Sequence, residues 1–249
     1  MIIFKILILL GCLLVGYLAG SIPSGVLIGK YIYHIDPRET GSHNTGGTNV
    51  GRTMGHKAGV ITILLDMFKI IIPFLAAWAL FTFCTPVVEF MSDGDYSINA
   101  FGQGNTLCEL AYYLVAIGGL FGHSYSIFLK FKGGKLVACY SGFALATSWT
   151  ALPIFAPIFF ITLKIKKYVS LSSLVMCGAF AVFSWVLYVL FIFFGPEVPG
   201  WFMFTQYGPH ACIYYPIVVT LSYALMVWKH RANLGRIKDG TESKIKWMK

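Results

Sequence analysis

The sequence predicts an all-α integral membrane protein with seven transmembrane helices, its N-terminus outside and its C-terminus in the cytoplasm. Three observations lead to this fold class: 57% of the residues are hydrophobic, only 12% are charged, and long apolar runs alternate with short polar segments. A soluble domain is typically about 45–50% apolar and about 25% charged. Because the apolar runs occupy most of the chain, we expect a single membrane-embedded domain over residues 1–249.

Three apolar runs in the first half are each long enough to cross a bilayer, which takes about 20 helical residues. They extend from Met1 to about Ile28, from Ala58 to Phe83 and from Leu110 to Phe128. In the first run, Gly16, Gly20 and Ser24 recur at four-residue intervals, a pattern that lets a neighbouring helix come close. Pro23 is expected to kink this helix.

An acidic and a basic residue lie within the second apolar run. Asp66 and Lys69 are three positions apart and therefore share one face of a helix. An ion pair inside a membrane is a candidate functional feature, but two charged side chains near a helix end can also snorkel to the interface. Both interpretations fit the sequence.

The second half of the chain is expected to hold two short helices and two further spans. Pro153 and Pro157 interrupt the apolar stretch after residue 136, so we expect two short helices that turn near Pro153 and form a hairpin. One span then runs from about Ser170 to Phe194, and the last ends at Trp228. The hydroxyls of residues 170, 172 and 173 are expected to cap the first of these helices or to bind an anion there.

The charge distribution sets the orientation of the helices. Nearly all lysines and arginines fall in segments 30–57, 130–135, 164–167 and 229–249, whereas segments 84–107 and 195–212 contain acids and no lysine or arginine. By the positive-inside rule the basic segments are cytoplasmic. Three cysteines, Cys84, Cys108 and Cys212, fall near the outer face, where a disulfide is conceivable. The six cysteines show no metal-binding spacing, and we expect no metal, no cofactor and no nucleic-acid partner.

A glycine-dense polar loop, Gly41–Arg52, lies between the first two spans. Glycines leave backbone N–H groups free to turn toward an anion, Ser, Thr and Asn side chains add neutral donors, and Arg52 supplies a forked cation suited to phosphate. The same composition is also that of an ordinary turn between two membrane helices. Two further cytoplasmic clusters favour the phosphate interpretation: Gly133 and Gly134 among lysines at 130, 132 and 135, and His230 with Asn233 three positions apart.

Seven motifs in register resemble those of one enzyme family, the bacterial acyl-phosphate:glycerol-3-phosphate acyltransferases of the PlsY type. The motifs are Gly20–Gly25, Gly41–Arg52, Asp66–Lys69, Gly122–His123, Phe131–Lys135, Val169–Ser173 and His230–Asn233. Their order and spacing match from Gly20 to Glu242, which is nearly the whole chain.

The resemblance implies an enzyme of the bacterial cell membrane that makes the first acylation of phospholipid synthesis at the cytoplasmic face. It would transfer an acyl group from acyl phosphate to the sn-1 hydroxyl of glycerol 3-phosphate, giving lysophosphatidic acid and inorganic phosphate, with a partner enzyme that supplies acyl phosphate. The resemblance implies site roles for Ser42, Arg52, Gly133, Gly134, Lys135, Ser172, His230 and Asn233. Together with Asn44, which we add from the glycine-dense loop, the expected catalytic residues are Ser42, Asn44, Arg52, Lys135, His230 and Asn233. The expected substrate- and phosphate-binding residues are Gly133, Gly134 and Ser172, with Gly41, Gly46, Thr48 and Asn49 added from the same loop.

An acyl phosphate already carries a good leaving group, so the reaction needs orientation and charge neutralisation more than a covalent intermediate. We expect Ser42 and Asn44 to orient the acyl phosphate and Arg52 and Lys135 to hold the two phosphates. His230 and Asn233 are expected to position the glycerol hydroxyl. The base is either His230 or a phosphate oxygen of the donor.

The sequence departs from the family pattern at several positions. His43, Ile70 and Leu136 stand where glycine is usual, Gly47 where alanine is usual, Ser126 where proline is usual and Cys139 where threonine is usual. Leu136 is expected to matter most, because a glycine at that position either takes a positive φ or lets the backbone come close to a ligand. We expect the geometry at Lys135 to be affected.

Two other classes of protein share some of these features. A transporter of small phosphorylated metabolites would also have cationic loops and broken helices, but we find no internal repeat, and the polar motifs fall on one face. A glycerophosphate acyltransferase that uses acyl thioesters normally has a histidine followed five positions later by aspartate, a pair that is absent from this sequence. The acyl-phosphate enzyme therefore fits the residues better.

Overall fold

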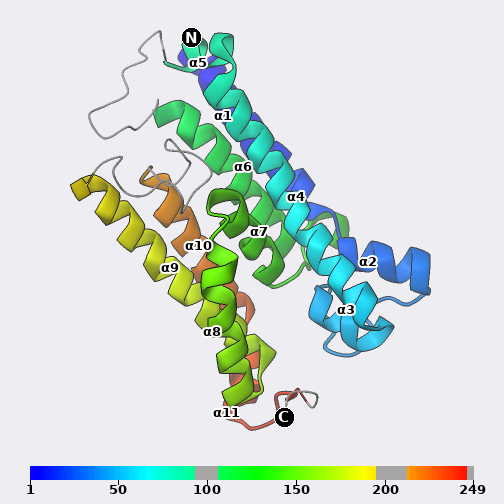
Figure 1. Ribbon diagram of the computed structural model, residues 1–249. Helices are drawn as coiled ribbons and strands as arrows, with labels where there is room; N and C mark the ends of the chain where they lie inside the picture. The colour runs from blue at the N-terminus through cyan, green and yellow to red at the C-terminus, as the bar shows by residue number, and fades with distance from the viewer. Residues whose placement is uncertain (93–105, 195–211, 246–249) are drawn as a thin grey trace. The chain divides into compact units, whose positions relative to one another are not determined.

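The computed structural model describes residues 1–92, 106–194 and 212–245, and its regular elements in these ranges are all helices (Figure 1). The chain divides into two compact units, one formed by residues 1–99 and 104–146 and the other by residues 100–103 and 147–249. Four described helical segments are long and apolar enough to cross a membrane: Ile2–Tyr33, His56–Phe83, Leu107–Leu129 and Val169–Phe194. The all-α membrane class is confirmed, whereas the count of seven spans and their orientation stay predictions.

The first unit contains seven helices within the described ranges. They are α1 Ile2–Ser21, α2 Ser24–Ile28, α3 Gly47–Met54, α4 His56–Phe83, α5 Thr85–Ser92, α6 Thr106–Ser124 and α7 Val137–Thr147, whose last residue belongs to the second unit. A π-helical turn, Gly29–Tyr33, follows α2, and a 3-10 turn, Ile127–Leu129, follows α6. In Figure 1 α1 and α4 run along α6, and α2 and α3 lie together at one end of this unit.

Glycines bring α1 and α6 into close contact. A methyl group added at Gly16 or Gly20 would collide with the backbone carbonyls of Val115 and Gly119 on α6. The contact is reciprocal, since a methyl group at Gly122 would collide with the backbone of α1. The small-residue face expected from the sequence is therefore confirmed for these two glycines, and it allows the two backbones to touch.

Pro23 breaks the first membrane helix rather than only bending it. The helix α1 ends at Ser21 and α2 begins at Ser24, because proline has no N–H to continue the ladder. The carbonyls freed at the break find side-chain donors: Oγ of Ser126 donates to the Ser21 carbonyl at 2.6 Å, and Nζ of Lys69 donates to the Ile22 carbonyl at 2.8 Å. The break is thus a satisfied structure inside the first unit.

Two short helices occur where the sequence predicted loops. The helix α5 lies in the expected outer loop because its apolar side chains pack inward, with Met91 only 1% exposed. The Met91 carbonyl accepts a hydrogen bond from Nζ of the buried Lys5 at 3.1 Å. The helix α3 lies within the glycine-dense loop, and its cause is described with the site below. The rest of the predicted outer loop, residues 93–105, and segment 195–211 fall outside the described residues.

The second unit consists of α8 Ala151–Lys166, α9 Val169–Phe194, α10 Tyr214–Lys229 and α11 Arg231–Lys238 within its described part (Figure 1). Aromatic rings join them: Phe155 of α8 contacts Phe180 of α9 at a centroid distance of 5.4 Å, and Phe180 contacts Tyr215 of α10 at 6.5 Å. The helix α9 therefore packs against both of its neighbours.

The two short helices predicted in the middle of the chain are present, and the break between them, at residues 148–150, lies near Pro153 as expected, although Pro153 and Pro157 themselves fall within α8. The first, α7, ends at Thr147, and α8 begins at Ala151. Pro153 lies in the first turn of α8, where the missing N–H costs nothing because it would have no intrahelical partner. The hairpin itself stays a prediction, since α7 belongs to the first unit and α8 to the second. None of the six cysteines forms a disulfide within the described part of the chain.

The contact between α1 and α6 predicts opposite effects for two glycine substitutions in α1. Gly20→Ala should lower the thermal stability of the purified protein, because the new methyl group meets the Gly119 carbonyl. Gly11→Ala is the matched control, since a methyl group there meets nothing within 4 Å. Alanine in place of glycine is worth up to ~1 kcal/mol in an open helix position, so Gly11→Ala should be neutral or stabilising. Equal melting temperatures for the two variants would contradict this packing.

Candidate active site

The glycine-dense loop is organised by one buried side chain, the amide of Asn49. Its Oδ1 accepts the backbone N–H of Ser42 at 2.7 Å. Its Nδ2 donates to the carbonyls of Pro37, Thr40 and Asn44 at 2.7, 3.0 and 2.9 Å. The side chain is 2% exposed, and every polar atom of the amide is used. Asn49 therefore holds the loop in shape rather than presenting its amide to a ligand.

The second half of this loop is helical because of its glycines. The helix α3 packs against the start of α4, where a methyl group at Gly47 would collide with Ile63 and come within 2.7 Å of the Gly59 carbonyl. A methyl group at Gly59 would in turn come within 2.7 Å of Gly51 Cα. Glycine and asparagine are poor helix formers, so sequence propensity could not show α3. Tertiary contact overrides propensity here, and Gly47 leaves room for Ile63.

The same loop exposes several of the predicted catalytic and binding side chains. Ser42, Thr48 and Arg52 are exposed, and Arg52 has no ion pair with any residue that the structure describes. Asn44 accepts the Gly46 N–H on its Oδ1 at 2.9 Å and so shapes the entry to α3. Gly41 has φ +62° and lies against Oδ1 of Asn49, so both its conformation and its lack of a side chain are needed.

The two other cations near the start of this loop are neutralised by Asp36. Nη2 of Arg38 lies 2.6 Å from the Asp36 carboxylate, and Nζ of Lys30 lies 3.6 Å away. The hydrogen bond from the Arg38 side chain, assisted by the Lys30 charge, lowers the pKa of Asp36 to about 2. Arg38 is thus committed to an internal partner, unlike Arg52.

The glycines of the lysine-glycine loop, residues 130–135, do not offer their N–H groups to an anion. The Gly133 N–H donates to the Ser124 carbonyl at 3.2 Å, and the Gly134 N–H donates to the His123 carbonyl at 2.9 Å. The interpretation of this loop as a free N–H cradle is therefore wrong. Both groups are used in hydrogen bonds to the end of α6. Of the three lysines of the loop, Lys130 and Lys132 are exposed, whereas Lys135, next to α7, is half-buried.

Two departures from the family pattern occupy left-handed backbone conformations. Leu136 has φ +70° and is fully buried, while His43 has φ +54° and is exposed. Positive φ is uncommon for residues other than glycine, although histidine adopts it more readily than leucine. This finding explains why glycine is usual at both positions. Leu136 stays in this unfavourable conformation because its side chain is buried in the core and its carbonyl accepts the Tyr140 N–H at 2.7 Å.

The remaining departures each fill a specific place in the first unit. Ile70 is 1% exposed, and its Cδ1 would lie 2.8 Å from a methyl group at Gly119. Ser126 has φ −62°, which proline also adopts, but its hydroxyl supplies the bond to the Ser21 carbonyl that proline could not make. The Sγ of Cys139 donates to the Asp66 carbonyl at 3.1 Å.

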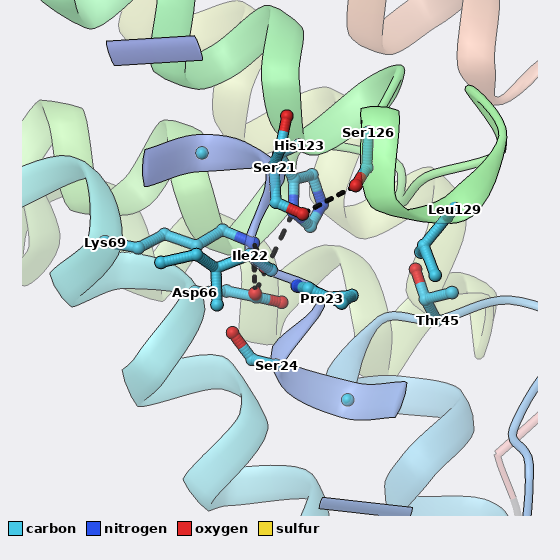
Figure 2. Close-up of a pocket in the computed structure, with 12 residues that line it drawn as sticks. Ser21, Ile22, Pro23, Ser24, Thr45, Asp66, Lys69, His123, Ser126 and Leu129 are labelled. Carbon is cyan, nitrogen blue, oxygen red and sulfur yellow. Dashed lines mark hydrogen bonds and ion pairs between the residues drawn. The ribbon is translucent and has the colours of Figure 1, made fainter. Parts of the chain in front are cut away.

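A buried polar cluster lies at the break in the first helix (Figure 2). Nζ of Lys69 lies 2.8 Å from Oδ1 of Asp66, and Nδ1 of His123 lies 3.8 Å from the same oxygen. The Lys69 and His123 side chains are each 7% exposed and the Asp66 side chain is 3% exposed, so the snorkelling interpretation is wrong. A cavity of about 10 Å³ beside them is lined by Asp66, Lys69 and His123 and by hydroxyl side chains such as Ser24. This volume is about the space that one water molecule needs.

The same cluster brings three possible metal ligands together. One ligand atom each from Asp66, His123 and Cys139 lie within 4.8 Å of one another. The Lys69 ammonium, however, is already 2.8 Å from the Asp66 carboxylate and compensates its charge. A divalent cation would have to share that carboxylate with a buried ammonium, which is electrostatically unfavourable. The donor set therefore does not fit a resident metal ion.

In the second unit Asn233, a residue predicted for catalysis, is one of three side chains that bind Glu242. Nδ2 of Asn233 donates to Oε1 of Glu242 at 2.7 Å, Nε of Arg236 lies 2.7 Å from Oε2, and Oγ of Ser170 donates to Oε1 at 2.9 Å. Burial opposes ionisation of this carboxyl, but these three hydrogen bonds lower its pKa overall. Glu242 thus fixes Asn233 and joins α11 to the start of α9. Sequence reasoning used Glu242 only as the end of the motif match.

His230 lies at the junction of α10 and α11 and is 3% exposed. Its Nδ1 lies 2.8 Å from the Met226 carbonyl. A carbonyl can only accept, so Nδ1 carries the proton, and in the neutral ring the lone pair is on Nε2. His230 and Asn233 are three positions apart, as predicted, and both are buried.

The serines at the start of α9 do not cap it. The helix begins at Val169, so these residues lie inside its first turn. Oγ of Ser172 donates to the Tyr168 carbonyl at 2.9 Å, and Oγ of Ser173 donates to the Val169 carbonyl at 2.9 Å. Such bonds to the preceding turn are common for serine within helices, and the capping interpretation is wrong for them.

The described units therefore assemble the predicted residues in two groups. The first unit carries Ser42, Asn44, Arg52 and Lys135, and the second carries Ser172, His230 and Asn233. The positions whose structural role sequence reasoning missed are His123, Ser126 and Glu242. His123 had a signal, since it directly follows Gly122 at the end of a span, but its partner Gly134 is 11 positions away and no local pattern links the two.

Comparison with known proteins assigns the chain to a family. The family model described as glycerol-3-phosphate acyltransferase matches residues 10–240. The chain belongs to this family. It is therefore a membrane enzyme that acylates glycerol 3-phosphate in bacterial phospholipid synthesis.

The relatives of this acyltransferase match over nearly their whole length. A glycerol-3-phosphate acyltransferase of Staphylococcus carnosus (strain TM300) is 35% identical over 242 residues, covering 95% of this chain and 97% of the relative. One of Staphylococcus aureus (strain Newman) is 34% identical over 239 residues, with the same coverage. The crystal structure of the integral membrane glycerol 3-phosphate acyltransferase PlsY in its glycerol 3-phosphate form matches with a TM-score of 0.69 and 27% identity, covering 96% of each chain. Its lysophosphatidic acid form matches with a TM-score of 0.66 and 26% identity.

The hydrogen bonds of Asn49 predict that the glycine-dense loop loses its ordered conformation when this amide is removed. Asn49→Ala leaves the Ser42 N–H and three carbonyls without their partner, and a buried polar group left unsatisfied costs about 1–3 kcal/mol. We expect a lower melting temperature and faster cleavage by trypsin at Arg52. Thr48→Val, at the exposed neighbouring position, serves as the stability control. Unchanged protease resistance in Asn49→Ala would show that the amide does not hold the loop.

Leu136 predicts that restoring the usual glycine is harmful to stability. Leu136→Gly removes left-handed strain of ~1–2 kcal/mol but deletes a fully buried side chain, and truncating a buried leucine costs roughly 2–5 kcal/mol. The melting temperature should therefore fall. His43→Gly relieves the same kind of strain at an exposed residue and should be neutral or stabilising. A rise in stability for Leu136→Gly would mean that strain outweighs packing.

Proposed function

We propose that this enzyme transfers an acyl group from acyl phosphate to the sn-1 hydroxyl of glycerol 3-phosphate, releasing lysophosphatidic acid and inorganic phosphate. The observation that carries the proposal is the loop held by Asn49, which presents Ser42, Thr48 and an Arg52 that has no ion-pair partner among the described residues. A forked cation beside neutral donors suits a phosphate group. The glycerol 3-phosphate form of the PlsY structure supports the choice of acceptor.

The donor follows from what the site residues are able to do. An acyl phosphate carries a phosphate leaving group, so expulsion is assisted by neutralising that phosphate rather than by protonating an amine or alcohol. In our proposal Ser42 and the Nδ2 of Asn44 orient the donor, while Arg52 and Lys135 hold the two phosphates. The N–H groups of Gly47 and Thr48 at the start of α3 have no intrahelical partner and add to the anion site. Gly41, Gly46 and Asn49 shape this loop.

The acceptor hydroxyl is assigned to the second unit. His230 and Asn233 position this hydroxyl. Ser172, in the first turn of α9, is assigned to the same substrate. The tautomer set by the Met226 carbonyl puts a lone pair on Nε2 of His230, which is the nitrogen that would take the hydroxyl proton or accept its hydrogen bond. The phosphate oxygens of the donor are the alternative base.

We further propose that both units form one membrane-embedded domain over residues 1–249, with seven spans, the N-terminus outside and the active site at the cytoplasmic face of the bacterial cell membrane. The family model spans both units, and the relatives match 95% of the chain, which supports one functional domain. The positive-inside rule supports the orientation. Membrane lipid surrounds the domain, and an enzyme that makes acyl phosphate supplies the donor.

The donor is tested directly with purified protein in lipid. Labelled glycerol 3-phosphate is offered with either palmitoyl phosphate or palmitoyl-CoA, and 1-acyl-glycerol 3-phosphate is measured. We expect product only from palmitoyl phosphate. Product only from palmitoyl-CoA would overturn the donor assignment, and no product from either, in folded protein, would point to a transport function.

Two arginine variants test the site in the same assay. Arg52→Gln should reduce kcat/KM by about 10²–10³-fold, the usual loss when one group that stabilises the transition state is removed. Arg38→Gln removes the same charge from the segment just before this loop, but Arg38 is already paired with Asp36. The Arg38 variant should therefore stay within a few-fold of the parent. Equal losses would indicate a general effect of loop charge.

A further inference from the structure

We propose that the ring of His123 is a positioning element for the lysine-glycine loop, and that Gly134 is a glycine because this ring lies against it. The proposal rests on the function proposed above, in which Lys135 holds a substrate phosphate. His123 itself contacts no substrate in this account. It sets the place of the backbone from which Lys135 extends.

The contact between Gly134 and His123 is close on two sides. A methyl group added at Gly134 would collide with Nε2 of His123 and come within 2.6 Å of Cε1 and 3.2 Å of Cδ2. On the backbone side, the Gly134 N–H donates to the His123 carbonyl at 2.9 Å. The loop is thus held between the backbone and the side chain of one residue.

The other reasons for a glycine at this position do not apply. Neither Gly133 nor Gly134 is among the described residues with positive φ. Both N–H groups donate to carbonyls of α6 and are not directed at a ligand. The remaining reason for a glycine is lack of space for a side chain. At Gly134 the imidazole ring of His123 occupies the place that a side chain would need.

The ring is held in turn by the ion pair of α4. Nδ1 of His123 lies 3.8 Å from Oδ1 of Asp66, and that oxygen lies 2.8 Å from Nζ of Lys69. Lys69 also donates to the Ile22 carbonyl at the helix break at 2.8 Å, as Figure 2 shows. The lysine-glycine loop is therefore connected through His123 to α4 and to the break in the first helix.

The glycine-dense loop also contacts the chain close to the break at Pro23. Just beyond it, in α2, a methyl group at Gly25 would collide with the Thr45 carbonyl of the glycine-dense loop. Both phosphate loops of the first unit thus pack against one rigid junction. A misplacement of about 1 Å can cost about 10²-fold in rate, so a junction of this kind sets how well Arg52 and Lys135 act together.

The test is a double-mutant cycle on Gly134 and His123, read as the KM for glycerol 3-phosphate and kcat at saturating palmitoyl phosphate. Gly134→Ala should raise KM at least about tenfold with a smaller change in kcat, because the loop carrying Lys135 is displaced by the ring. The double variant Gly134→Ala/His123→Ala should be no worse than His123→Ala alone, since the obstructing ring is gone. Losses that multiply in the double variant would overturn the proposal.

Gly133→Ala is the matched control. A methyl group there would collide with the His123 carbonyl and come within 2.9 Å of the Ser124 carbonyl carbon, which are backbone atoms. Removing the His123 side chain cannot relieve that collision. We therefore expect no rescue of Gly133→Ala by His123→Ala, and rescue of both glycines alike would show a non-specific effect and overturn the assignment.

The same cycle is also run without substrate, as the yield and melting temperature of folded protein, so that it stays informative if the proposed reaction is wrong. Recovery of the stability of Gly134→Ala by His123→Ala would support the contact even in a protein that uses another donor. A parent enzyme without activity toward palmitoyl phosphate would count against the proposed function alone. Failure of the double variant to recover either yield or stability would overturn the role of His123.

Discussion

The first unit depends on how it satisfies two backbone carbonyls at the break in its first helix. Proline at position 23 interrupts this helix, so carbonyls at the break lose their intrahelical partners. Ser126, from the segment after α6, donates to the Ser21 carbonyl, and Lys69 of α4 donates to the Ile22 carbonyl, which also accepts the Ser24 N–H. These bonds tie three parts of the chain to one point in the first unit.

Glycine serves close packing far more than flexibility in this enzyme. At Gly20, Gly47 and Gly134 the absent side chain lets a carbonyl, an isoleucine and a histidine ring, respectively, come into contact. Without a hydrophobic driving force between helices in lipid, such contacts are a main source of association. Glycine-rich segments that look like ligand cradles in a sequence can therefore be joints between helices.

Composition and hydropathy were sufficient to predict the membrane class, an irregularity at Pro23 and the bounds of α9 to within one residue, because these features depend on local apolar runs and on proline. The irregularity was expected as a kink, and the structure shows a break. The helix α3 could not be predicted, since several of its residues disfavour a helix and its packing against the start of α4, at Gly59 and Ile63, is not visible in the local sequence. The glycine-dense loop was identified correctly as a distinct feature, but the roles inside it depend on which amide is buried. Asn44 and Asn49 cannot be distinguished in the sequence. In the structure, both polar atoms of the Asn49 amide form hydrogen bonds to backbone groups of residues 37–44.

The carboxylate of Glu242 anchors helical residues from outside any helix. It is the group on which Asn233, Arg236 and Ser170 converge, and it follows every helix that the structure describes. A chain cut after Lys238 would keep all of these helices, yet it would lack the partner that fixes Asn233. The hydrogen-bonded connection between α11 and the start of α9 therefore depends on a side chain that contributes to neither helix.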